Sequence, residues 1–140
     1  MSYNSEKYKK SVLTTCSHGR TNIPDDSDLI EVSRIVHISG TSVDSINGYH
    51  VLKHKGLYRA DAKTIYRAAK NGSVIVWLEL DGIELHCSRV VFDVNAGQTV
   101  SLVACVPAFC VSEGCHVLTL HCCGANGVCK NSMLSTTKLA

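Results

Sequence analysis

The sequence is short of charged residues and long apolar runs. Charged side chains make up 19% of its 140 residues, against about 25% in an average soluble domain. This shortfall predicts that part of the surface is covered, most simply by another subunit. The longest apolar run, 102–111, is interrupted by Pro107 and is about half as long as a membrane-spanning helix requires. A net charge of +2 gives no indication of nucleic-acid binding, so we expect neither a membrane nor a nucleic acid as partner.

The start of the chain lacks the apolar stretch of about 7–15 residues that a secretory signal needs. After Lys7, Lys9 and Lys10, only Val12 and Leu13 form an apolar pair. We therefore expect synthesis in a reducing cytoplasm, where cysteines act as small hydrophobic residues or metal ligands. A protein that is assembled in a cell and later released on a particle would meet oxygen only afterwards.

Residues 1–28 lack any helical or alternating apolar period. They are polar and turn acidic at their end, which predicts an N-terminal anchoring arm, followed by one domain over 29–140. A mobile terminus is the alternative. The residues expected to anchor the arm are its apolar and basic side chains: Tyr3, Lys7, Tyr8, Lys9, Lys10, Val12, Leu13 and Ile23.

From Leu29 onward the pattern is that of β-strands. Residues 57–69 alternate between an apolar face and a charged face, which indicates a half-buried strand. Asp81-Gly82 predicts a tight hairpin turn between strands over 73–80 and 83–92. Pro107 places whatever follows it at an edge or in a loop. About eight to ten antiparallel strands, with no convincing helix, favour an all-β jelly-roll sandwich.

Six of the eight cysteines lie between residues 105 and 129. Zinc prefers four thiolate or imidazole ligands, usually supplied as two close pairs, and no such paired motif is present. A zinc set is still conceivable, from Cys110, Cys115, His116 and Cys122. A disulfide, either across the Cys110–Cys115 loop or between a pair of strands, is a second alternative. Buried free thiols are the preferred interpretation, so we expect no cofactor and no metal.

Catalytic arrangements are lacking as well. In His86-Cys87 a thiol and an imidazole are neighbours in sequence, but neighbours along a strand face apart, and activation needs hydrogen-bond reach. Phosphate-binding and nucleophile-elbow motifs are missing, so we expect no enzyme. A ligand face for a glycan is conceivable at four residues, although a solvated sheet face is the preferred interpretation. These residues are Arg59, Lys63, Tyr66 and Arg67.

One segment points to a family. Residues 56–85 read GLYRADAKTIYRAAKNGSVIVWLELDGIEL, and this stretch resembles the jelly rolls of tumour necrosis factor and of complement globular heads. Residues 35–140 as a whole are similar to small jelly-roll domains of bacteriophage fibre heads. The resemblance implies a trimer packed about a three-fold axis, with an N-terminal segment attaching it to a larger object.

Together these observations predict a non-enzymatic virion protein. We expect a homotrimeric head fibre or capsid decoration protein, assembled in the host cytoplasm and bound through its arm to the major capsid protein or another virion protein. The alternative is a receptor-binding module that recognises a bacterial surface glycan. The residues expected at the trimer interface are apolar and lie in the C-terminal half: Val103, Cys105, Val117, Leu118, Leu120, Met133 and Leu134.

Overall fold

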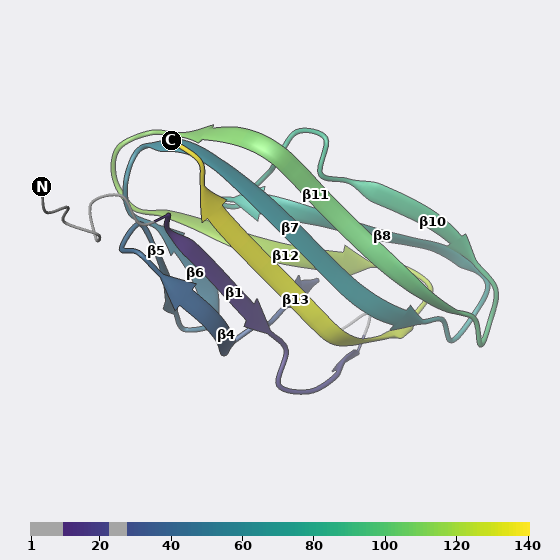
Figure 1. The fold of residues 1–140 in the computed structure, drawn as a ribbon. Helices are drawn as coiled ribbons and strands as arrows, with labels where there is room; N and C mark the ends of the chain where they lie inside the picture. Colours follow the sequence, from purple (N-terminus) through teal and green to yellow (C-terminus); the bar gives the residue numbers. More distant parts are fainter. Residues whose placement is uncertain (1–9, 23–27) are drawn as a thin grey trace, which may run out of the picture.

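The computed structural model describes residues 10–22 and 28–140, in which every regular element is a β-strand (Figure 1). Three strands have only two residues: β2 (Thr21–Asn22), β3 (Leu29–Ile30) and β9 (Ile83–Glu84). The longer ones are β1 (Val12–Cys16), β4 (Arg34–Ser39), β5 (Val43–Ile46), β6 (Tyr49–Leu52), β7 (Gly56–Arg67), β8 (Gly72–Leu80), β10 (Val90–Val94), β11 (Thr99–Val111), β12 (His116–Cys123) and β13 (Val128–Lys138).

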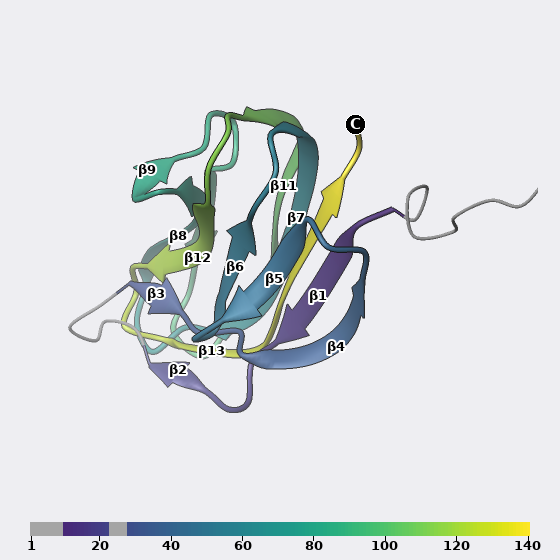
Figure 2. The same ribbon diagram turned by 90° about the vertical axis from the view of Figure 1, so that its left-hand side faces the viewer.

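The strands form two antiparallel sheets that pack face to face, as Figure 2 shows. Sheet A has the order β11-β7-β13-β1-β4, with β2 beside β13. Sheet B has the order β10-β8-β12-β6-β5, with β3 beside β12 and β9 beside β8. The all-β jelly-roll prediction is therefore confirmed. Within the described ranges, no helix has the length and apolar character needed to cross a membrane.

The core lies between the sheets and is built by the alternation of each strand. On β7, Tyr58 and Tyr66 point inward and are fully buried, while Arg59 and Arg67 point outward. The facing strand β12 contributes Leu118 and Leu120 from sheet B. Burying a large apolar side chain stabilises a fold by about 1.5–3 kcal/mol, so this inner layer supplies most of the stability.

One polar seam crosses the core. His50 of β6 is fully buried and reaches from sheet B to two threonines of sheet A. Its Nε2 lies 2.7 Å from Thr15 Oγ1 on β1, and its Nδ1 lies 2.8 Å from Thr136 Oγ1 on β13. Burial lowers the pKa of His50 to about 4, so the imidazole is neutral at pH 7 and links the sheets by hydrogen bonds.

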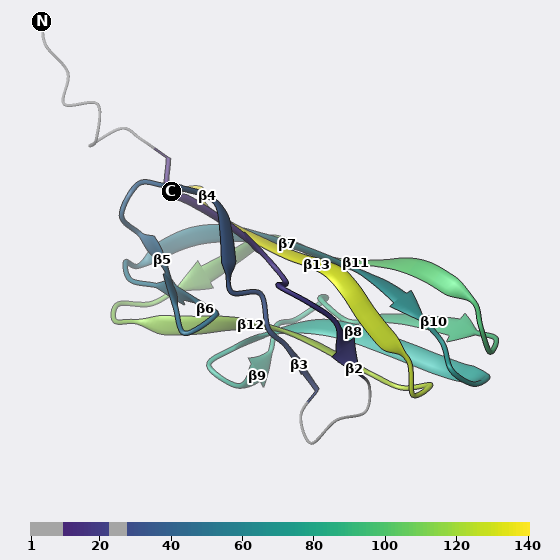
Figure 3. The same cartoon turned by 90° about the horizontal axis from the view of Figure 1, so that it is seen from below.

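The sandwich has two distinct ends, visible in Figures 1 and 3. At the turn end, three connections are tied together by hydrogen bonds from Ala96 N to Asn71 Oδ1 (2.8 Å) and from Ala69 N to Ala125 O (3.3 Å). At the opposite end, which we call the terminal end, Lys138 N donates to Ser11 O (2.9 Å). The first described residues and the last ones therefore lie together at the terminal end.

The structure corrects the predicted extent of the N-terminal anchoring arm, residues 1–28. Strand β1 pairs with both β13 and β4 inside sheet A, and Leu13 is fully buried. Val12, also assigned to the arm, is half-buried in the same strand, and Lys10 is exposed beside it. The domain thus begins by residue 12, and residue 28 is not its boundary. The other anchoring candidates, Tyr3, Lys7, Tyr8, Lys9 and Ile23, lie outside the described residues.

One further strand prediction changes, and the edge position predicted after Pro107 is found. The expected strand 83–92 is interrupted, because Ser88 turns back and its hydroxyl hydrogen-bonds the backbone of Leu78 and Leu85. Strand β11 continues past Pro107, with a bulge between Val106 and Phe109. It lies at the edge of sheet A, where a proline costs no ladder hydrogen bond on its solvent side.

Candidate subunit interface

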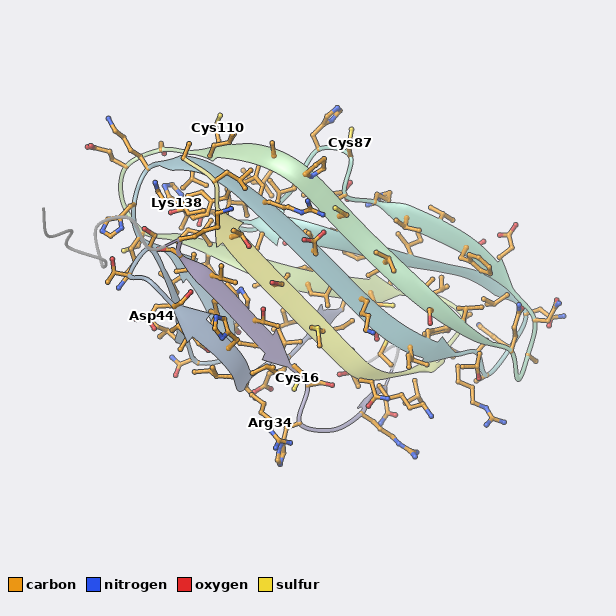
Figure 4. All side chains as sticks on the ribbon, viewed as in Figure 1. Cys16, Arg34, Asp44, Cys87, Cys110 and Lys138 are labelled. Atoms are coloured by element: carbon orange, nitrogen blue, oxygen red, sulfur yellow. The ribbon has the colours of Figure 1, made fainter. Side chains whose placement is uncertain are left out.

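The outward surface of sheet A, which we call the A face, is viewed directly in Figure 4. Cys16 and Arg34, at paired positions of β1 and β4, are labelled at one side, and Cys110 and Lys138 are labelled toward the terminal end. The alternation of β7 directs Arg59, Asp61 and Lys63 to this face, followed by Ile65 and Arg67. The charged side of the predicted strand is therefore the A face.

Two neighbouring strands place apolar side chains on either side of Lys63. Val103 of β11 and Met133 of β13 are its cross-strand partners. Val103 is 55% exposed and Met133 is half-buried. Cys105, half-buried, lies two residues from Val103 and opposite Asp61. Three of the predicted interface residues thus share one surface.

A short hydrogen-bonded chain crosses the A face from β7 to β11. Arg59 donates to both carboxylate oxygens of Asp61, at 2.9 and 3.3 Å, and the thiol of Cys105 donates to Asp61 Oδ1 at 2.9 Å. Partial burial acts to raise the pKa of Asp61, but the bonds from Arg59 and Cys105 outweigh it and hold that pKa below its usual value. The hydrogen bond to Asp61 raises the pKa of Cys105, so Cys105 keeps its proton and is a poor nucleophile.

Lys63, Arg67 and Lys130 of the A face have no acidic partner among the ion pairs of the described residues. Lys63 and Arg67 lie on β7 on either side of Ile65, and Lys130 of β13 lies opposite Ile65. The cationic part of the predicted ligand face thus shares a surface with Val103 and Met133. A partner that covers the A face would therefore cover both the cations and these apolar side chains.

The rest of the predicted trimer interface requires correction. Leu118, Leu120 and Leu134 are at most 1% exposed and pack in the core between the sheets. Val117 is half-buried on the outward side of sheet B, the opposite surface of the sandwich. These four side chains cannot join Val103 on one contact. Alternation turns the three leucines into the core, and Val117 faces away because β12 belongs to sheet B.

Tyr66 is not part of a ligand face. It is fully buried, and its hydroxyl donates to Gly124 O at 2.7 Å. Trp77 is only 7% exposed, since its ring stacks on His121 (centroids 5.4 Å apart) and Arg89 lies over it at 5.4 Å. Neither ring is available to stack on a sugar, which weakens the glycan alternative.

The conceivable zinc set is not brought together. Cys122 is fully buried in the core, whereas Cys110 and Cys115 are exposed. His116 is occupied by Asp81, with Nδ1 and Oδ2 2.5 Å apart. In the part of the chain that the structure describes, no three His, Cys, Asp or Glu side chains are grouped to hold a metal ion.

A Ser-His-Asp arrangement that sequence reasoning missed lies near the terminal end. His116 Nε2 is 3.2 Å from Ser112 Oγ, and its Nδ1 contacts Asp81. The same Nε2 also faces the carbonyl oxygens of Ser112 (3.1 Å) and Glu113 (3.3 Å). The hydrogen bond to Asp81 raises the pKa of His116. The two carbonyl oxygens accept only from a protonated Nε2, and through these contacts His116 links the 112–116 turn to Asp81 of the 81–82 turn.

Exposed apolar side chains mark both open edges of the sandwich. On β4, the edge strand of sheet A, Ile35, Val36 and Ile38 are 44–59% exposed. At the other edge, Phe92 of β10 in sheet B is 42% exposed, and β10 contacts β11 of sheet A, which carries Val103. Sequence reasoning did not select these residues. The β-branched run in β4 was the available signal.

Comparisons with known proteins bear on the fold alone. No family model matches the chain, and no curated protein matches it. Among solved structures, murine APRIL at pH 5.0 is 18% identical with a TM-score of 0.71, over 93% of this chain and 99% of that chain. Eiger TNF from S. frugiperda is 12% identical with a TM-score of 0.69, over 94% and 92%. The protein therefore has a jelly-roll fold of the tumour-necrosis-factor type.

Proposed function

We propose that the protein is a homotrimer and acts as a non-enzymatic structural module. The observation that carries this proposal is the exposure of apolar side chains on two separate surfaces of one chain. Val103 and Met133 lie on the A face, with Phe92 at the adjoining edge, while Ile35 and Ile38 lie on the opposite edge. Exposed apolar patches of this kind are typical of protein contacts.

Two different apolar patches on one chain, one on the A face and one on the β4 edge, favour a closed ring of subunits. In a head-to-tail contact, one patch of each subunit packs on the other patch of its neighbour, and the ring closes when the rotation allows it. The likeness to tumour-necrosis-factor jelly rolls supports closure at three. The low content of charged residues, 19%, also supports a covered surface.

A charge on the A face is expected to dissociate the trimer. The variant Val103→Asp places a carboxylate beside Lys63 in the proposed contact. Removing this charge from water costs several kcal/mol, and pairing with one surface lysine offsets that cost only in part. Because Val103 is 55% exposed on an edge strand, the fold of the single chain is retained. Light scattering after size-exclusion chromatography should give about three times 15.1 kDa for the natural protein and one chain mass for the variant.

The matched control is Ile83→Asp. Ile83 is 74% exposed on β9 of sheet B, where it pairs with Leu80, six residues along β8 from the partner of Phe92, and this variant should remain a trimer. A natural protein that is monomeric at micromolar concentration, or a Val103→Asp trimer, would reject the proposal. Circular dichroism checks that both variants keep their β-sheet content.

We further propose that the trimer is a head fibre or decoration protein of a virus particle, attached through residues 1–9. Lys10, the first described residue, lies beside the terminal end of the sandwich, and its carbonyl oxygen accepts a hydrogen bond from Ser39. A tether that precedes it would leave from that end, with the three turns at the other end facing outward.

Deleting residues 1–9 is expected to leave the trimer intact and to abolish its binding to particles. The deletion spares β1, whereas removing residues 1–28 also removes β1 from the middle of sheet A and should prevent folding. Co-sedimentation with particles that lack the protein measures the binding. A truncated trimer that still sediments with the particles would contradict attachment through this segment.

A further inference from the structure

Two buried cysteines face each other across the core near the turn end. Cys122 belongs to β12 of sheet B and Cys129 to β13 of sheet A, and both are fully buried. Residues 124–127 connect the two strands. The pair thus lies where the chain crosses from one sheet to the other.

The two thiols lie close to the same tyrosine. Tyr66 is the cross-strand partner of Cys129, and its hydroxyl donates to Gly124 O, two residues after Cys122. The thiol of Cys122 hydrogen-bonds to the sulfur of Cys129, and this contact, with burial, raises the pKa of Cys122. Cys129 accepts that hydrogen bond and a second one from Thr64, and these lower its pKa. Cys129 is therefore the member of the pair that more readily becomes a thiolate, the form that attacks disulfides.

The other six cysteines are exposed or half-exposed. Cys105 is engaged with Asp61. Cys123, next to Cys122 in sequence, is only half-buried and lies on the opposite side of β12. It therefore provides a matched control on the same strand.

We propose that Cys122 and Cys129 form a disulfide that joins sheet B to sheet A when the protein meets a disulfide oxidant such as glutathione disulfide. The Cys129 thiolate attacks one sulfur of the oxidant, forming a mixed disulfide and releasing one thiolate. The deprotonated Cys122 then attacks the Cys129 sulfur and releases the second thiolate. The two cysteines lose two electrons and two protons, and one oxidant molecule becomes two thiols.

Burial sets when this reaction occurs. Because neither sulfur is exposed, an oxidant reaches the pair only when the 124–127 connection opens or while the chain is folding. Oxidation should be slow in the folded protein and fast during refolding, so a protein made in a reducing compartment would acquire the bond after leaving it.

Chemical cleavage tests the pairing directly. Hydroxylamine cuts Asn–Gly bonds, and the sequence has three, at Asn47-Gly48, Asn71-Gly72 and Asn126-Gly127, the last of which lies between the two cysteines. Cys129 is the sole cysteine of fragment 127–140. After refolding with glutathione disulfide and blocking of free thiols, that fragment should stay attached to fragment 72–126 until a reductant is added.

The variants identify the partner. Cys122→Ala should release fragment 127–140 without reductant, whereas Cys123→Ser should retain it. A Cys110–Cys115 disulfide would not hold the fragment, because both cysteines lie before the cut. Release from the oxidised natural protein, or retention in Cys122→Ala, would overturn the proposal. Tandem mass spectrometry of the joined fragments identifies the bonded pair in the natural protein even if a variant fails to fold.

Thermal unfolding provides a second measurement. A disulfide that closes the short loop from Cys122 to Cys129 is expected to raise the midpoint temperature of unfolding by about 5–10 °C in a chain of 140 residues. The increase on oxidation should appear in the natural protein and in Cys123→Ser, and it should be lost in Cys122→Ala. Equal midpoints for the oxidised and reduced natural protein would count against a bond that joins the sheets.

Discussion

Acidification from pH 7 to pH 4 is expected to lower the free energy of unfolding by about 3 kcal/mol through His50 alone. The folded state holds this imidazole at a pKa of about 4, whereas its ordinary value is 6.5. Below pH 6.5 the unfolded chain therefore binds a proton that the folded chain excludes. The stabilisation is complete above pH 6.5 and is lost progressively as the pH falls toward 4.

Replacement of the ring isolates this contribution. His50→Gln keeps a donor and an acceptor between Thr15 and Thr136 but has no titratable proton, so its stability should vary less with pH over this range. His116, whose pKa is raised by Asp81, acts in the opposite sense, because its stabilisation is present at low pH and lost as the pH rises. The difference between the natural protein and His50→Gln removes that shared contribution.

Urea titrations at a fixed protein concentration, between pH 4 and pH 7.5, measure the effect. A matched titration of His116→Gln should show the opposite change in pH dependence. If the natural protein and His50→Gln lose stability in parallel as the pH falls, His50 is not the group responsible.

Gly124→Ala is expected to destabilise the fold by about 3–4 kcal/mol. Gly124 has a φ of +106°, which an alanine adopts only with strain, and an added Cβ would lie 2.1 Å from the carbonyl oxygen of Ser73. That oxygen belongs to the backbone of β8, so the sheet itself would have to shift.

Gly82→Ala separates the cost of backbone strain from the cost of the clash with Ser73. Gly82 also has a positive φ, +80°, but nothing lies within 4 Å of its added Cβ. Its replacement should cost about 1 kcal/mol, from backbone strain alone. Denaturation midpoints of the two variants at equal protein concentration give the comparison. Equal losses would show that the contact with Ser73 relaxes and that strain dominates at both turns.

The sequence predicted best where the pattern is local. The alternation of residues 57–69 assigned the inward and outward sides of β7 correctly. Asp81-Gly82 forms the expected tight turn, with φ values of +54° and +80°. In each case the information lies within a few neighbouring residues: a period of two, or a pair of residues that tolerates left-handed backbone.

Strand β1 was missed because its burial is determined elsewhere. Val12–Cys16 reads VLTTC, which is too short and too polar to stand out from a flexible terminus. It is buried because β13, more than a hundred residues further along the chain, pairs with it. Sequence alternation cannot reveal such a partner.

The predicted trimer interface combined residues from the core and from opposite surfaces of the sandwich, for a related reason. Alternation indicates that Leu118 and Val117 face opposite ways, but it does not reveal that β12 belongs to sheet B, so that Val117 points to the outer surface of that sheet. Val117 and Val103 therefore looked equivalent, although they lie on opposite surfaces of the sandwich. Only the order of strands in each sheet separates them.

The position of β13 also has a consequence for synthesis on the ribosome. β13 follows all the other strands in chain order, yet it lies in the middle of sheet A between β7 and β1. Until it emerges, the nascent chain holds β1 and β7 without their shared neighbour, and the inward side of β7 lacks part of its cover. Sheet A is thus completed in one late step, and a chaperone that shields β7 until then would limit aggregation.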